Sequence, residues 1–317
     1  MGSINQTWNM EFFLLGLSTH PETQKCLFAL FLVMYLVILA GNMLIMLVVS
    51  RDMHLHTPMY YFLSHLSFLD ICYTTTVIPK MLSNFLAKHK TISFVGCMTQ
   101  MYISLSLGAT EFILLTVMAY DRYMAICHPL HYSTIMSQGL CTQMAAECWL
   151  SGFVSGVVIT VSTLHLPFCG KKTINHFVCE VLAVQHLACS SSFVGDAIML
   201  GAGTLILLIP FILVVMSYVY ILTTILHIRS AEGRHRAFST CSAHLMVVSL
   251  CYGTAIFVYL RPRSHYFPKQ GKTISVFYCI VTPMLNPMIY SLRNQEVKAA
   301  LVKLSEEMRK GRTLPCL

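Results

Sequence analysis

Seven long apolar stretches constrain this chain more than any other feature of its sequence. A helix rises 1.5 Å per residue, so about 20 apolar residues cross the roughly 30 Å hydrocarbon core of a bilayer. Lipid offers the backbone no hydrogen-bond partners, so each stretch must be helical. We therefore predict an all-α membrane protein, a seven-helix transmembrane bundle. The stretches cover roughly residues 26–50, 58–82, 97–126, 140–165, 196–227, 237–260 and 272–292.

The composition agrees with a membrane protein and argues against other classes. Of 317 residues, 56% are hydrophobic and only 11% are charged. The formal charge of +8 is spread between the spans rather than gathered in a patch, which argues against nucleic-acid binding. Residues 1–25 are polar and mixed and contain no short apolar core, so we expect no cleavable signal peptide. The first span would then act as its own insertion signal.

Lysine and arginine divide almost evenly between the two sides of the predicted bundle, so they do not orient it. Asn5-Gln6-Thr7 is a glycosylation sequon, and several cysteines lie in the loop after the fourth span. Both features belong to the secretory lumen. We expect an extracellular N-terminus (residues 1–25), a seven-helix transmembrane domain (26–292) and a cytoplasmic segment (293–317) at the plasma membrane. Gln295–Arg309 has one apolar face, which predicts a short amphipathic eighth helix on the membrane surface.

An acid and a base stand side by side where the third span should leave the lipid. Either Asp121 or Arg122 alone at bilayer depth would cost about 3 kcal/mol. Two readings are open. The pair is an interfacial anchor, or it is a switch in which the acid holds the arginine until a partner protein takes it.

Four motifs resemble the olfactory-receptor branch of the rhodopsin-like G-protein-coupled receptors. Met118–Tyr132 reads MAYDRYMAICHPLHY, and Leu55–Tyr60 reads LHTPMY. Arg236–Leu245 reads RAFSTCSAHL, with Arg at a position where the family usually has Lys, and Pro283–Asn294 reads PMLNPMIYSLRN. The resemblance covers essentially the whole chain. It implies a receptor that is not an enzyme, binds an odorant from outside, activates a stimulatory G protein and raises cyclic AMP.

The resemblance also assigns a switch at the cytosolic ends of the helices. Pro287 removes a backbone donor inside the seventh span, which predicts a kink that serves as a hinge. In an active state, two tyrosine hydroxyls would meet Arg122, while in the resting state we expect Asp121 and Arg122 to be paired. The implied switch residues are Asp121, Arg122, Tyr123, Tyr218, Asn286, Pro287 and Tyr290.

Four of the thirteen cysteines lie on the predicted outer side, where disulfides persist. Four cysteines allow three pairings, and the sequence alone does not choose between them. The resemblance implies Cys97–Cys179 and Cys169–Cys189, which would make the second outer loop a lid. His176, Cys179 and Glu180 also have a spacing that suits a copper or zinc site. We favour the structural reading, because a disulfide cysteine cannot be a thiolate ligand.

Polar residues inside the apolar spans should face the interior of the bundle. These are Asn42, Asp70, Glu111 and Asn286. Two acids in one pocket invite a cation or a shared proton, and rhodopsin-like receptors hold sodium near the position of Asp70. We expect either a bound sodium ion at Asp70 and Glu111 or a neutral hydrogen-bond network with one acid protonated. No other cofactor is expected.

The ligand cavity is expected in the outer half of the bundle, between spans 3, 5, 6 and 7. None of the positions assigned to it is charged, so a small, volatile and mostly apolar ligand fits and an amine does not. Ser104 stands where amine receptors carry Asp. The candidates are Ser104, Leu105, Gly108, Ala109, Phe112, Met199, Ala202, Gly203, Ile206, Tyr252, Ala255, Ile256, Tyr259, Val276 and Cys279.

Two other classes of membrane protein compete with this reading. A channel or transporter is expected to contain paired half-helices or an internal repeat, and we find neither in the sequence. An intramembrane protease could use Asp70 and Glu111 as a carboxylate pair, but no GxGD-like or HExxH context surrounds them. A ligand-dependent cyclic AMP response separates all three classes.

Overall fold

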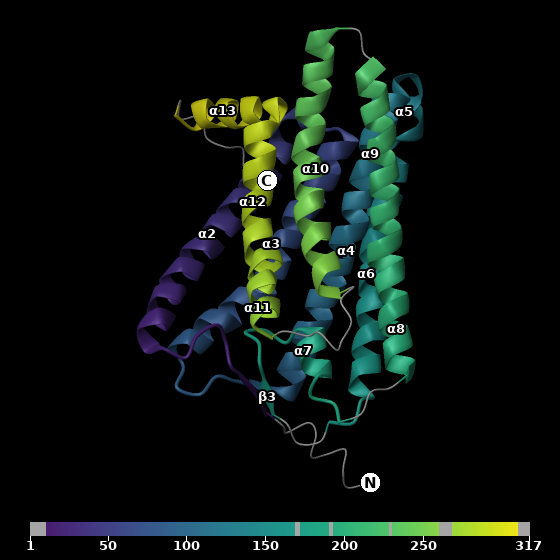
Figure 1. Ribbon diagram of the computed structural model, residues 1–317. Coiled ribbons are helices and arrows are strands. Elements are labelled where there is room, and N and C mark those ends of the chain that lie inside the picture. Colours follow the sequence, from purple (N-terminus) through teal and green to yellow (C-terminus); the bar gives the residue numbers. More distant parts are fainter. Residues whose placement is uncertain (1–10, 169–171, 190–192, 228–229, 260–267, 310–317) are drawn as a thin grey trace.

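The computed structural model describes residues 11–168, 172–189, 193–227, 230–259 and 268–309. Its main feature is a bundle of long, roughly aligned helices, with a short helix lying across one end (Figure 1). The seven-helix bundle predicted from the apolar stretches is confirmed. The first four spans are α2 (Pro21–Arg51), α3 (Pro58–Leu86), α4 (Phe94–Cys127) and α6 (Gln138–Leu164). The sixth is α10 (Ala231–Tyr259).

The fifth and seventh spans each contain one wider, π-helical turn. The fifth runs through α8 (Phe193–Gly203), η2 (Thr204–Leu208) and α9 (Ile209–His227). The seventh runs through α11 (Pro268–Val276), η4 (Phe277–Val281) and α12 (Thr282–Arg293). Such turns insert an extra residue into a helix and are frequent at functional sites. Apolar periodicity did not reveal the turn in the fifth span, because the residues on both sides of η2 are mostly apolar.

Six of the described helices are long and apolar enough to cross a membrane, and α3 is not among them. The reason is its content of polar residues, which include His65, Asp70 and Lys80. Still, α3 has 29 residues and packs between α2 and α4, so it completes the seven-helix bundle. Asp70 is 1% exposed, which places the polar side of α3 in the interior.

A small β-sheet covers one end of the bundle, and the sequence did not predict it. Its central strand is β1 (Glu11–Leu14), which pairs antiparallel with β2 (Thr91–Ser93) and parallel with β3 (Thr173–Ile174). Strands of two to four residues are too short to show the alternation on which strand prediction depends. The sheet joins the N-terminal segment to the loops that follow α3 and α6.

The end of the bundle opposite the sheet carries two short helices and the amphipathic helix. The first two are η1 (Met53–Leu55) and α5 (Pro129–Ile135). The third is α13, which spans Gln295–Arg309 as predicted and lies across the bundle end (Figure 1). It buries its apolar face, and its Lys303 Nζ lies 3.6 Å from Asp52 Oδ2 in the first inner loop. A hydrogen bond from the His54 N–H is the main reason that the pKa of Asp52 is lowered.

Candidate ligand cavity and cytosolic switch

A cavity of about 410 Å³ opens between α3, α4, the fifth span, α10 and the seventh span, beneath the second outer loop. Its size suits a small organic ligand. Most of the residues that the sequence assigned to a ligand site line it. These are Ser104, Leu105, Gly108, Ala109, Phe112, Met199, Ala202, Gly203, Ile206, Ala255 and Cys279.

Three assigned residues do not line the cavity. Tyr252 is fully buried, its hydroxyl donates to the Phe112 carbonyl over 2.8 Å, and its ring lies 5.0 Å from that of Phe112. Ile256 and Val276 pack on the hydrophobic core. Helix periodicity alone cannot separate a cavity-facing residue from its neighbour at a helix interface. The side chain of the fourth residue, Tyr259, lies outside the described part of the structure.

Acidic side chains line the cavity, which corrects the expectation that it is uncharged. Glu180 from the outer loop and Asp196 from α8 lie on its wall, together with Glu111. Glu180 belongs to the motif read as a possible metal site, and Asp196 marks the expected start of the fifth span. Neither position signals a cavity in the sequence, because the loop must fold back over the bundle to bring Glu180 there. The cavity can therefore offer carboxylate oxygens to a ligand as well as apolar surface.

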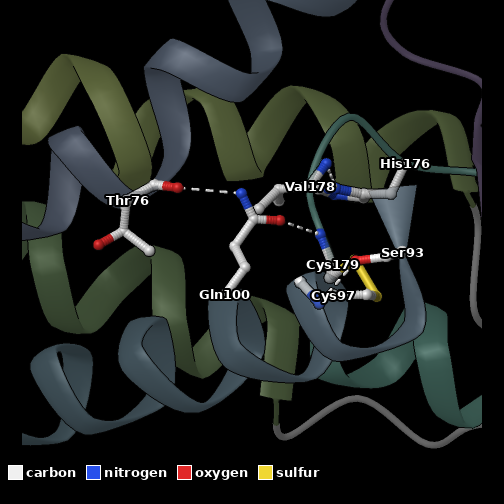
Figure 2. Close-up of a disulfide and its surroundings, with 8 residues drawn as sticks. Thr76, Ser93, Cys97, Gln100, His176, Val178 and Cys179 are labelled. Atoms are coloured by element: carbon white, nitrogen blue, oxygen red, sulfur yellow. Dashed lines mark hydrogen bonds between the residues drawn. A yellow bond between two sulfur atoms is a disulfide. The ribbon is translucent and has the colours of Figure 1, made fainter. Parts of the chain in front are cut away.

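A disulfide ties the outer loop to the top of α4. Cys97 and Cys179 are bonded with their Cα atoms 5.4 Å apart, as the resemblance implied (Figure 2). Beside it, Gln100 accepts a hydrogen bond from the Cys179 N–H and donates one to the Thr76 carbonyl, each over 3.0 Å. The loop is thus fixed to both α4 and α3. Cys189 is also disulfide-bonded. Its expected partner Cys169 and the sequon at Asn5 lie outside the described residues.

The residues of the possible copper or zinc site all have partners within the loop or on the helices that it contacts. His176 Nδ1 accepts from the Val178 N–H over 3.2 Å, and its Nε2 lies 3.1 Å from Ser275 Oγ. Cys179 is in the disulfide, and Glu180 accepts a hydrogen bond from the Ala183 N–H at the start of α7 (Val181–Gln185). No cluster of three or more metal-binding side chains occurs within the described residues. The structural reading of this motif is the one that the geometry favours.

Burial fixes His176 in its neutral form. Loss of solvent lowers its pKa from 6.5 to about 3, and the charge on Lys272 adds to the shift. Below pH 6.5 the His176 imidazole is protonated when the loop is unfolded but stays neutral when the loop is folded. The free energy of unfolding therefore falls as the pH falls. From pH 7.5 to pH 5 the loss is about 2 kcal/mol.

We expect this loss to appear as a lower thermal midpoint at pH 5 for the receptor in lipid nanodiscs. The variant His176→Asn cannot take up the proton and should lose most of the pH dependence between pH 7.5 and pH 5. His89→Asn alters an exposed loop histidine and is the matched control. Equal pH dependence in wild type and His176→Asn would contradict the role given to burial.

The acid and base at the C-terminal end of α4 are not paired with each other in this structure, in contrast to the closed pair expected for the resting receptor. Asp121 Oδ1 instead accepts a hydrogen bond from the Tyr132 hydroxyl of α5 over 2.8 Å. Adjacent residues on a helix point about 100° apart, so their side chains do not face each other. Burial and the nearby Asp121 carboxylate raise the pKa of the Tyr132 phenol, which keeps it a donor. Arg122 Nε is buried and has no hydrogen-bond partner.

Other residues implied in the switch lie on the facing helices. Tyr218 OH is 2.6 Å from His244 Nδ1, which links the fifth span to α10, and Tyr290 OH is buried without a hydrogen-bond partner. Tyr123 forms a hydrogen bond with His128 over 2.9 Å at the end of α4.

Pro287 lies inside α12, and a methyl group at Gly41 would stand 3.0 Å from its ring. The close packing of α2 on this proline depends on that glycine.

The two acids inside the bundle, buried Asp70 and partly exposed Glu111, have separate hydrogen bonds. Asp70 Oδ2 accepts from Asn286 over 2.9 Å, and Glu111 Oε1 accepts from the Cys251 thiol over 3.2 Å. The second oxygen of Asp70 and the amide oxygens of Asn42 and Asn286 are buried and have no hydrogen-bond partner. Oxygen atoms of this kind are what a hard cation requires. The residues therefore fit a small cation as well as a shared proton.

Comparison with known proteins agrees with this arrangement. The sequence profile of the olfactory receptor family matches residues 31–307. This chain belongs to the olfactory receptor family. Human olfactory receptor 2F1 and the dog olfactory receptor-like protein OLF3 are each 53% identical to it over 304 residues, which is 96% of both chains in each pair. Human olfactory receptor 13C9 is 51% identical over 306 residues, 95% of this chain and 96% of that protein. The family consists of G-protein-coupled receptors, so the multi-pass bundle is that of a receptor.

Proposed function

We propose that this olfactory receptor binds a small, mostly apolar odorant in the 410 Å³ cavity and activates a stimulatory G protein, which raises cyclic AMP. The observation that carries the proposal is the position of the cavity. It lies among the same helices whose cytosolic ends hold Arg122, Tyr218 and Tyr290. A ligand bound there contacts every helix that must move to expose the arginine.

Tyr252 gives a physical route from the cavity to the switch. Its hydroxyl lies 2.9 Å from Thr116 Oγ1 and bonds to the carbonyl of Phe112, whose ring lines the cavity. Cys251, the preceding residue of α10, also lines the cavity. Two turns earlier on α10, His244 bonds to Tyr218. A ligand that favours a different packing of Phe112 against Tyr252 would shift α10 and with it the cytosolic end.

A ligand drives such a shift only through its preference for one state. A tenfold change in the population of the active state needs about 1.4 kcal/mol of differential binding. One hydrogen bond to a lining side chain supplies about 0.5–1.5 kcal/mol, and apolar contact adds to it. Because Glu180 and Asp196 lie on the wall, an odorant with a hydroxyl or another donor group suits the cavity better than a pure hydrocarbon.

We also propose that Asp70 and Glu111 hold a sodium ion or share a proton in the resting receptor. The free oxygens of Asp70, Asn42 and Asn286 support this proposal. The extracellular N-terminus and cytoplasmic C-terminus follow from the same reading, since the disulfide-bonded loop then faces the secretory lumen. The G-protein partner would bind at the end that carries α5 and α13.

The proposed function is tested by expressing the full chain in cells and screening a panel of odorants for cyclic AMP production, normalised to receptor at the surface. We expect concentration-dependent responses to some small apolar compounds that carry a hydrogen-bond donor. A receptor that reaches the surface and responds to none of a broad panel would count against the proposed ligand class. Ion flux without cyclic AMP would instead favour a channel.

A further inference from the structure

One residue of the cavity wall is also exposed on the outside of the bundle. Among the described lining residues, only Leu200 is exposed rather than buried or half-buried, and it is 70% exposed. Leu200 lies about two turns into α8, within the 35-residue apolar span Phe193–His227. The surroundings of an exposed leucine at this depth are lipid rather than water. One edge of the cavity therefore reaches the lipid-facing side of the bundle.

The described part of the outer loop closes the aqueous side. Val178, Cys179 and Val181 line the cavity and are at most 3% exposed. Glu180 is 8% exposed. The disulfide and Gln100 fix this segment to α4 and α3 (Figure 2). A route from water through this segment would require it to leave both helices.

The opening beside Leu200 has a structural cause. In the described chain, α8 packs against α6, while α10 meets the fifth span chiefly lower down, at η2 and α9. Two glycines follow Leu200 within three residues on α8. A Cβ atom added at Gly201 or Gly203 would find no other atom within 4 Å, and Gly203 lines the cavity. The outer part of the fifth span therefore leaves space where larger side chains would fill it.

We infer that Leu200 marks a portal through which an apolar ligand passes between the outer leaflet of the membrane and the cavity. The inference rests on the proposed function, in that the cavity is taken to hold a small apolar ligand. Such a ligand concentrates in lipid, on the order of a thousandfold for a six-carbon body, from the transfer free energy of its CH₂ groups. The membrane then supplies the ligand at the side of the bundle where the cavity is open.

The portal can be tested without a known odorant, because the cavity carries its own thiol. Cys279 lines the cavity and is 1% exposed, so a reagent reaches it through the cavity. The full-length receptor in phosphatidylcholine nanodiscs is treated either with N-phenylmaleimide, which dissolves in lipid, or with a sulfonated maleimide, which stays in water. The thiol sulfur adds to one carbon of the maleimide double bond and its proton goes to the other, so no co-reactant is needed. Peptide mass spectrometry reports the labelling rate at each cysteine.

We expect N-phenylmaleimide to label Cys279 several-fold faster than the sulfonated reagent does. Leu200→Trp should slow that labelling several-fold, because the indole fills the opening while the lipid-facing site tolerates its size. Leu205→Trp is the matched control. Leu205 is on the same span, is 67% exposed and does not line the cavity, so its replacement should leave the rate unchanged. Exposed Cys26 serves as the internal standard for reagent delivery.

Three outcomes would overturn the portal. These are equal rates for the two reagents at Cys279, an unchanged rate in Leu200→Trp, and no labelling of Cys279 by N-phenylmaleimide while Cys26 is labelled. None of these readouts involves an odorant or a G protein. Failure of the portal is thus distinct from failure of the proposed function, which the cyclic AMP response decides.

Discussion

Gly152→Leu is expected to abolish the receptor at the cell surface. Gly152 of α6 lies against α4, where an added Cβ would contact Thr110 Oγ1 and stand 2.6 Å from the Ser106 carbonyl oxygen. Gly156, one turn along, meets Ser106 in the same way. Small residues four apart on both helices let their backbones approach closely. The atoms met at Gly152 include backbone, so the cost should exceed the roughly 1–3 kcal/mol of ordinary overpacking.

The control for this prediction is Gly139→Leu in the same helix. A Cβ at Gly139 meets no other atom within 4 Å, so the same substitution should leave surface staining near the wild-type level. Surface staining and total protein are measured for both variants in the same cells. Normal surface levels of Gly152→Leu would show that α4 and α6 do not pack as closely as described.

Arg122→Ala is expected to reduce odorant-stimulated cyclic AMP to the level of cells without receptor, at unchanged surface expression. The C-terminal end of a helix presents unpaired carbonyls and a partial negative charge. The C-terminal helix of a G-protein α subunit would offer such an end to a cation, and Arg122 Nε has no other hydrogen-bond partner. Loss of the guanidinium removes that interaction while leaving the outer cavity untouched.

Arg51→Ala is the matched control, because Arg51 is an exposed arginine in the last turn of α2 at the same end of the bundle. Its replacement should preserve the response. A wild-type response of Arg122→Ala, at equal surface receptor, would remove the switch assignment and leave the reading of the charged pair as an interfacial anchor. The Asp121–Tyr132 hydrogen bond should be kept in both variants, since neither substitution removes one of its two side chains.

The sequence predicted the parts of this structure that solvent dictates. Lipid forces apolar stretches into helices, so the spans were found to within a few residues, and the apolar face of Gln295–Arg309 gave that helix its observed bounds. The interior position of Asp70 and Asn286 followed from the cost of exposing them to lipid. The pairing of Cys97 with Cys179 came from family resemblance, because spacing alone allows three pairings.

Features that depend on long-range folding could not be predicted from local patterns. The Tyr132 hydroxyl reaches Asp121 only because α5 packs against α4. Glu180 enters the cavity wall because the loop is tied down by a disulfide, and β1 forms only where two other loops pass beside it. Helix spacing likewise placed Tyr252 near the cavity but did not show that its ring turns toward Phe112.

The claim at the centre of this account is that the cavity is where the activating ligand binds. The most direct measurement is the odorant-stimulated cyclic AMP response of Gly108→Phe, with Gly253→Phe as its control. Gly108 lines the cavity and Gly253 does not, and a Cβ at either position meets no other atom within 4 Å. We predict that Gly108→Phe, at wild-type surface level, fails to respond at any odorant concentration, while Gly253→Phe responds normally. An unchanged concentration–response curve for Gly108→Phe would contradict the account.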